Sequence, residues 1–153
     1  GTENVAGIVG FGKACELARL SSQEMDKISS LRDHFLQLVS SQIKGVEVFG
    51  DLENRLPNTL NIGFEGVEGD TLLIGLDMAG VAVSTGSACS SGTGLPSPVL
   101  TAMGIPTDKI NSSIRFSLGK SNTIAEIERA VKILVRTVST NRKGIHAERV
   151  IKS

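Results

Sequence analysis

Cys89 lies in the stretch VSTGSACSSGTGLP, residues 83–96, where most neighbours are glycine, serine or another small residue. A structural cysteine usually has apolar neighbours, and burial raises the pKa of its thiol and makes it inert. Glycine and serine instead favour a flexible, exposed segment in which a thiol can move and react. Composition alone leaves two interpretations equally open: a reactive thiol on a flexible loop, or a loop that happens to contain a cysteine.

Arg115 is the second residue whose position suggests chemistry. It lies in SSIRFSLG, where alternation puts Ile114 and Phe116 on one face of a strand and Arg115 with Ser117 on the other. The planar guanidinium fork of arginine is suited to bidentate binding of a carboxylate. An arginine on the solvated face of a strand is nevertheless the commoner case, so spacing alone favours that interpretation over a clamp.

The remaining polar candidates give weaker signals. Asn58 and Asn61 stand at the start of a predicted strand, where turn capping is the favoured interpretation. His34, expected on a helix surface, and His146 have no partner at ligand spacing, so no metal site is predicted. Cys15 lies within an apolar helical pattern and is expected to be a packed small residue.

Hydrophobic periodicity and capping signals predict the elements that position these residues. Together they indicate an α+β fold, a small mixed or antiparallel sheet with helices on one side. Helices are predicted over 3–19, 69–80 and 97–104, and a further one from the Ser21–Glu24 capping box to Gly45. A last helix follows the Thr123–Glu126 capping box and has Ile127, Val131, Leu134 and Val138 on one stripe. Strands are predicted over 46–49, 59–64, 81–85 and 112–119.

Composition excludes several classes of function. The 153 residues carry 16 basic and 16 acidic side chains and only five aromatic ones, all Phe, which argues against a nucleic-acid partner. No apolar run approaches the roughly 20 residues of a membrane span. Two cysteines without metal or disulfide spacing favour a cytoplasmic protein. We expect one domain over 1–140 and a polar, disordered C-terminal tail over 141–153.

Five motifs, taken in order, resemble a known family. GTENV, LPNTLNIGF, STGSACSSG, LPSPVLTAMG and SSIRFSLG are similar to the C-terminal part of the cysteine desulfurases, in the NifS/IscS-like branch of the class V aminotransferase group. The resemblance covers residues 1–140 and implies the small domain of a homodimeric fold-type I enzyme that uses pyridoxal 5'-phosphate. Such enzymes convert L-cysteine to L-alanine and pass the sulfur, as a cysteine persulfide, to an acceptor such as an iron–sulfur scaffold protein or a tRNA thiolation enzyme.

The same resemblance implies a role for three residues. Cys89 matches the nucleophile that becomes the persulfide, Arg115 the arginine that binds the substrate carboxylate, and Thr2 a threonine that reaches the cofactor phosphate across the dimer interface. The lysine that binds the cofactor in the family follows a Ser/Thr-x-His sequence, and none of the eight lysines here does. The chain also starts without Met. We therefore expect a piece of a longer protein that cannot hold the cofactor as a Schiff base and is inactive alone.

Two alternatives remain open at this point. The chain could be a cofactor-free module that carries sulfur on Cys89 or binds a partner. It could also belong to an enzyme similar to selenocysteine lyase, with the same arrangement of site residues.

Overall fold

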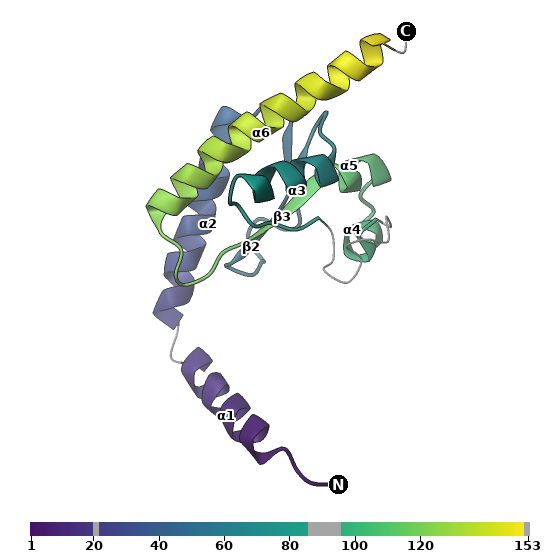
Figure 1. Cartoon of the computed structure of the whole chain (residues 1–153). Coiled ribbons are helices and arrows are strands. Elements are labelled where there is room, and N and C mark those ends of the chain that lie inside the picture. The colour runs from purple at the N-terminus through teal and green to yellow at the C-terminus, as the bar shows by residue number, and fades with distance from the viewer. Residues whose placement is uncertain (20–21, 86–95, 152–153) are drawn as a thin grey trace.

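The computed structural model describes residues 1–19, 22–85 and 96–151, with side chains described for 1–19, 24–85 and 96–144. The predicted α+β class is confirmed. In chain order the elements are α1 (Val5–Arg19), α2 (Ser22–Gln42), β1 (Val46–Phe49), β2 (Thr59–Phe64), α3 (Gly69–Met78), α4 (Pro98–Ala102), α5 (Thr107–Asn111), β3 (Ser113–Ser117) and α6 (Ile124–Ile151) (Figure 1).

The three strands form one antiparallel sheet in the order β1-β2-β3. The polar turn between β1 and β2 is held by Asp51, whose carboxylate accepts backbone hydrogen bonds from Asn54 and Glu53 at 2.6 and 2.7 Å. These bonds, the one from Asn54 first, lower the pKa of Asp51. Buried Arg32 of α2 donates to the carbonyl of Leu56 at 3.1 Å and so ties the turn to the helix.

Helices α2, α3 and α6 cover one face of the sheet, which we call the helix-covered face. Neighbouring residues of a strand point to opposite faces, so every second side chain of each strand enters this core. The rings of Phe35 and Phe116 meet there with centroids 4.8 Å apart. The buried residues of this core are Ile28, Leu31, Phe35, Val39, Ile43, Leu60, Ile62, Phe64, Val67, Leu72, Leu76, Ile114, Phe116, Leu118, Ile127, Val131, Leu134 and Val138.

The opposite face is covered at its β1 end by α4 and α5. Phe49 packs there against Leu100 of α4 and Ile110 of α5 in a second, smaller buried cluster. The Phe49 ring also lies against Gly63 of β2, where an added Cβ would come within 2.7 Å of Cζ. The expectation of helices on one side only is therefore wrong. α5 was not predicted, because five residues are too few to show a helical period.

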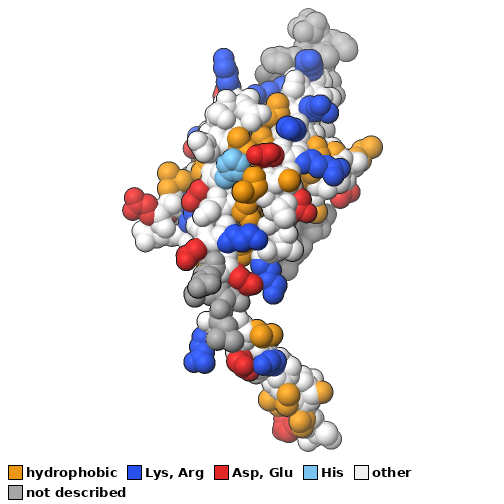
Figure 2. Space-filling view, turned by 90° about the vertical axis from the view of Figure 1, so that its left-hand side faces the viewer, with side chains coloured by type: hydrophobic (Ala, Val, Ile, Leu, Met, Phe, Trp, Pro, Cys, Tyr) orange, Lys and Arg blue, Asp and Glu red, His pale blue; other side chains and the backbone are white. Residues whose placement is uncertain are grey.

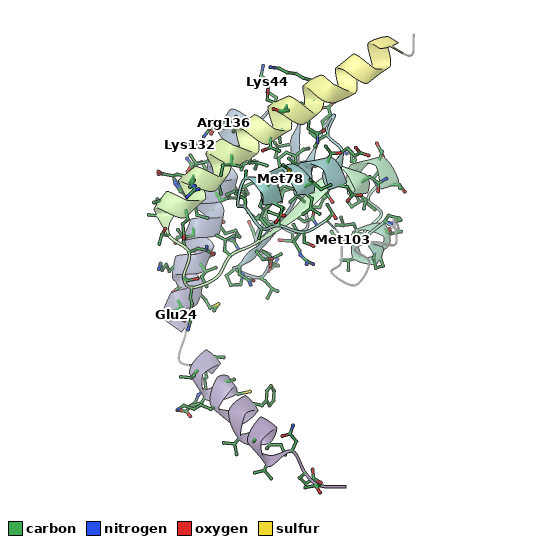
Figure 3. All side chains as sticks on the ribbon, viewed as in Figure 1. Glu24, Lys44, Met78, Met103, Lys132 and Arg136 are labelled. Carbon is green, nitrogen blue, oxygen red and sulfur yellow. The ribbon has the colours of Figure 1, made fainter. Side chains whose placement is uncertain are left out.

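Helix α6 begins at the predicted capping box and buries the predicted stripe. The Thr123 backbone donates to the Glu126 carboxylate at 2.9 Å, and the Glu126 backbone donates to the Thr123 hydroxyl at 3.3 Å. Figure 3 shows Lys132 and Arg136 on the side of α6 that faces away from the sheet, where both are exposed.

The prediction of a disordered tail from residue 141 is wrong, because α6 continues to Ile151. Buried Asn141 exchanges two hydrogen bonds of 3.3 Å with the backbone of Glu68. Arg142 donates to the carbonyls of Glu65 and Lys44 at 2.9 and 2.8 Å. These contacts anchor the start of the polar segment to the loops beside β1 and β2.

Helix α1 is helical as predicted, but none of its 15 residues is buried. Val5, Ile8, Val9 and Phe11 are each more than half exposed. Figure 1 shows α1 apart from the other elements, and Figure 2 shows its apolar side chains on the surface. Cys15, expected to be packed, is exposed. The spacing of apolar residues therefore predicted this helix correctly but not its burial.

Residues 81–85 do not form the predicted strand. The structure gives this segment one isolated antiparallel bridge, between Ser84 and Arg115. Val81 and Val83 are partly buried against the main core, which explains the apolar alternation without a ladder of hydrogen bonds.

Across the parts of the chain that the structure describes, no helix combines the length and the apolar character needed to cross a membrane.

Candidate functional site

Arg115 lies in the middle of β3, on the face of the sheet opposite the helix-covered face. Its neighbours Ile114 and Phe116 are buried in the main core, while Arg115 itself is half-buried, as the alternation predicted. Among the described residues, no side chain forms an ion pair or a hydrogen bond with its guanidinium. The strand therefore holds a partly desolvated guanidinium whose N–H groups bind none of the described side chains.

One row of side chains crosses this face of the sheet. Residues directly opposite each other in antiparallel strands project to the same side. The register pairs Phe49 with Asn61, Asn61 with Arg115, and Arg115 with Ser84. We call these four residues the Arg115 row. Phe49 anchors one end of it under α4 and α5, and Ser84 lies at the other end.

Ser84 attaches the chain that leads to Cys89 directly to Arg115. The backbone of Ser84 donates to the Arg115 carbonyl at 3.2 Å, and the Arg115 backbone donates to the Ser84 carbonyl at 2.7 Å. The hydroxyl of Thr85 donates to the Asp70 carboxylate at the start of α3, at 3.3 Å. Two elements therefore hold residues 84 and 85. Cys89 itself lies outside the described residues.

The two asparagines of the segment 57–64 differ in their surroundings. Asn58 has a local role, because its side-chain oxygen accepts from the hydroxyl of the adjacent Thr59 at 3.3 Å. Asn61 stands within β2, so the turn-capping interpretation is wrong for it. Its Oδ1 is buried and has no hydrogen-bond partner in the structure. The sequence showed an amide in the strand, but nothing in it signalled the unpaired oxygen.

Thr2 is not brought together with the Arg115 row. It is exposed in the segment before α1, and Figure 1 shows the N-terminal end far from the sheet. Its assigned contact requires the cofactor and a partner subunit, so its role stays a prediction.

His34 is less exposed than expected. Its Nε2 lies 3.8 Å from the Glu128 carboxylate, at the contact between α2 and α6, and forms no hydrogen bond. The side chain of His146 lies outside the described side chains.

An open groove of about 460 Å³ lies on the other side of the sheet, between α2, α6 and residues 80–83. Phe35, Phe116, Ile127 and Ile133 line it, and Arg115 does not. The groove is lined by both apolar and polar side chains, but Asn61, Ser84 and Arg115 are not among them, so it is separate from the Arg115 row.

Residues 1–130 match the aminotransferase class-V family. The chain belongs to the class-V aminotransferase family. It is 46% identical over 143 residues to a cysteine desulfurase IscS from Dictyoglomus turgidum, and equally to a cysteine desulfurase from a Nostoc species. Each alignment covers 93% of this chain and 36% of the relative. A solved structure of a NifS-like protein superposes with a TM-score of 0.78 at 33% identity, covering 92% of this chain and 35% of that one.

This chain thus spans about 36% of the length of the curated relatives it matches. These matches confirm the resemblance that the five motifs indicated: the family is the class-V aminotransferases, and the similar proteins are named cysteine desulfurase or NifS-like protein. The matched region includes Cys89, Arg115 and Thr2.

Pyridoxal phosphate, which the family implies, needs a lysine whose amine can lose its proton and react. Every lysine with a described side chain is exposed, and none belongs to the Arg115 row. The lysine packed against the same face of the sheet, Lys109 of α5, is held by Glu47 of β1 at 2.7 Å. This bond raises the pKa of Lys109, so its amine stays protonated. The described residues fit a substrate carboxylate, at Arg115, but not the cofactor as a whole.

Proposed function

We propose that this chain is the part of a cysteine desulfurase that binds the substrate carboxylate and carries the sulfur. The full-length enzyme takes sulfur from L-cysteine, leaves L-alanine and passes the sulfur to an acceptor protein. In this proposal Arg115 holds the carboxylate of L-cysteine, and Cys89 receives the sulfur.

The single observation that carries the proposal is the backbone pairing of Ser84 with Arg115. Cys89 lies five positions after Ser84 in the chain. A chain of five residues spans at most about 18 Å, which limits how far the Cys89 backbone can lie from the arginine. The pairing therefore supports a thiol that works close to a carboxylate held by Arg115.

The chemistry of the proposed transfer balances without an external oxidant. The Cys89 thiolate attacks the sulfur of L-cysteine, a sulfur–sulfur bond forms, and the carbon–sulfur bond of the substrate breaks. The electron pair of the broken bond stays with the substrate carbon, which takes up the proton lost by the substrate thiol and gives L-alanine. Pyridoxal phosphate supplies the electron sink that makes the carbon–sulfur bond reactive.

Arg115 orients the substrate rather than reacting with it. A guanidinium fork binds both oxygens of a carboxylate, and its position on a strand between two buried neighbours fixes the direction of approach. The half-buried setting strengthens the attraction, because solvent screens the charge less there than at the surface.

The remaining parts of the proposal concern the whole protein. We propose that the Schiff-base lysine lies in a region that this chain does not contain, and that Thr2 contacts the cofactor phosphate across a homodimer interface. The acceptor is an iron–sulfur scaffold protein or a tRNA thiolation enzyme. The relatives named cysteine desulfurase support the type of enzyme on which these assignments depend.

Replacing Cys89 by Ser in the full-length gene product tests the proposal. We expect Cys89→Ser to abolish persulfide formation and sulfur release from L-cysteine while the cofactor remains bound, as its absorbance shows. The matched control is Cys15→Ser, which removes the other cysteine, exposed on α1, and should turn over normally. Undiminished sulfur release by Cys89→Ser would contradict the assignment, and turnover of L-selenocysteine alone would favour the lyase alternative.

A further inference from the structure

The position of Asn61 relative to Arg115 follows from the hydrogen bonding of β3. Arg115 exchanges both of its backbone hydrogen bonds with Ser84. In an antiparallel sheet, a residue bonded to one neighbouring strand forms a non-hydrogen-bonded pair with the strand on its other side. Asn61 and Arg115 are therefore such a pair, with Cα atoms about 4.5 Å apart and side chains at their closest approach.

The side chain of Asn61 is incompletely satisfied. Its Oδ1 is buried and accepts no hydrogen bond in the structure. Buried acceptors without a donor are rare and costly, so such an atom in a folded protein calls for an explanation. The other asparagine of the same segment, Asn58, does have a partner for its side-chain oxygen. The unpaired oxygen therefore distinguishes the asparagine that faces Arg115.

The chemistry of the groups in the row limits which donor Oδ1 can use. A substrate carboxylate only accepts hydrogen bonds, so it cannot satisfy Oδ1. Phe49, on the other side of Asn61, has no polar hydrogen in its side chain. The guanidinium of Arg115 has five N–H groups, of which a bidentate carboxylate uses two. Arg115 thus has donors to spare next to an acceptor that needs one.

We propose that Asn61 is a positioning residue for Arg115, an inference that rests on the proposed function. When a carboxylate is bound, Oδ1 accepts an N–H of the guanidinium, a bond that the structure does not contain. This bond sets the plane of the fork, so that two N–H groups on one side of it meet the substrate carboxylate together. Asn61 does not touch the substrate. Asn61 therefore strengthens the binding only of ligands that carry a carboxylate.

The test uses the full-length enzyme with Asn61→Leu, which keeps the branching and the number of heavy atoms of the side chain and removes the amide. We expect the KM for L-cysteine to rise about tenfold, as for loss of one hydrogen bond to a charged group, with kcat within about twofold of wild type. Inhibition by L-alanine should weaken by a similar factor. Inhibition by cysteamine, which is cysteine without its carboxylate, should stay unchanged.

Two variants control for the stability of the strand. Asn61→Val replaces the amide by a β-branched residue that strands favour, and the same kinetic pattern is expected from it. Asn58→Leu removes the neighbouring amide, whose bond is local, and should leave the KM unchanged.

The outcomes separate this inference from the function on which it rests. A wild-type enzyme that releases no alanine from L-cysteine, or an Arg115→Ala variant with an unchanged KM, overturns the proposed function and the inference with it. Where both behave as proposed, an unchanged KM in Asn61→Leu or Asn61→Val overturns the inference alone. Equal weakening of L-alanine and cysteamine inhibition would also overturn it, since a general distortion of the site has no preference for carboxylates.

Discussion

The two faces of the sheet are made from alternate residues of the same strands, yet they are built differently. On the helix-covered face, Leu60, Ile62 and Ile114 are at most 1% exposed and enter one apolar core with α2, α3 and α6. On the other face, the Arg115 row places an arginine and an asparagine between a phenylalanine and the chain that leads to Cys89. On this second face the buried Oδ1 of Asn61 has no hydrogen-bond partner.

In the proposed function, this difference separates the residues of a single strand that stabilise the fold from the one that binds the substrate. Ile114 and Phe116 hold β3 in the core because both are buried. The residue between them is not needed for the core, so it can be one that binds a ligand. Arg115 gains a fixed backbone from its neighbours and contributes little to the core itself. Substitutions on the helix-covered face should therefore change the free energy of unfolding, and substitutions in the Arg115 row should change the KM for the substrate.

The largest expected effect on stability comes from the helix-covered face. Leu134 of α6 is 1% exposed in the main core, and truncating a buried leucine to alanine costs about 2–5 kcal/mol in free energy of unfolding. We expect Leu134→Ala to lower the urea midpoint of the 153-residue chain accordingly. On the same helix Ile124 is 60% exposed, and Ile124→Ala should change the free energy of unfolding by no more than about 0.5 kcal/mol. Equal losses in the two variants would contradict the assignment of the core.

A smaller effect on stability is expected from the capping box at the start of α6. The backbone hydrogen bond from Thr123, followed by side-chain bonds from Asn122 and Thr123, lowers the pKa of Glu126 below its ordinary value of 4.5. A carboxyl whose pKa is lower in the folded state stabilises the fold above its unfolded pKa, and that contribution is lost as the pH falls through the folded pKa.

Glu126→Gln isolates this charge, because glutamine keeps the shape of the capping box. Wild type should have the higher urea midpoint at about pH 7, and the difference should shrink as the pH falls below 4.5 and through the lowered pKa of Glu126 in the folded state. A difference that stayed constant over this range would show that the charge of the Glu126 cap does not matter.

Much of the fold followed from the sequence, because long amphipathic patterns predict helices, although the apolar residues of α1 are exposed. The stripe of Ile127, Val131 and Leu134 predicted α6, and the alternation around Arg115 predicted which of its neighbours are buried. The same logic failed for residues 81–85, where Val81 and Val83 are partly buried without strand pairing. In this segment the apolar period predicted which side chains are covered, but not what the backbone bonds to.

Contacts between distant segments account for the other errors. The polar composition of the tail predicted disorder, yet Asn141 and Arg142 bond to backbone groups near residues 44, 65 and 68. For the site, Arg115 was found from its motif, whereas the unpaired oxygen of Asn61 depends on a register between strands that are far apart in the chain. No local pattern encodes that register.

The most direct test of the central claim is the KM for L-cysteine of the full-length enzyme with Arg115→Lys. Lysine keeps the positive charge but lacks the fork, so a bidentate clamp should be lost and the KM should rise about 10- to 100-fold. The same substitution in the 153-residue chain should leave the urea midpoint near that of wild type, since Arg115 lies outside the main core. An unchanged KM, or a loss of stability comparable to that of Leu134→Ala, would contradict the claim that this face of the sheet binds the substrate.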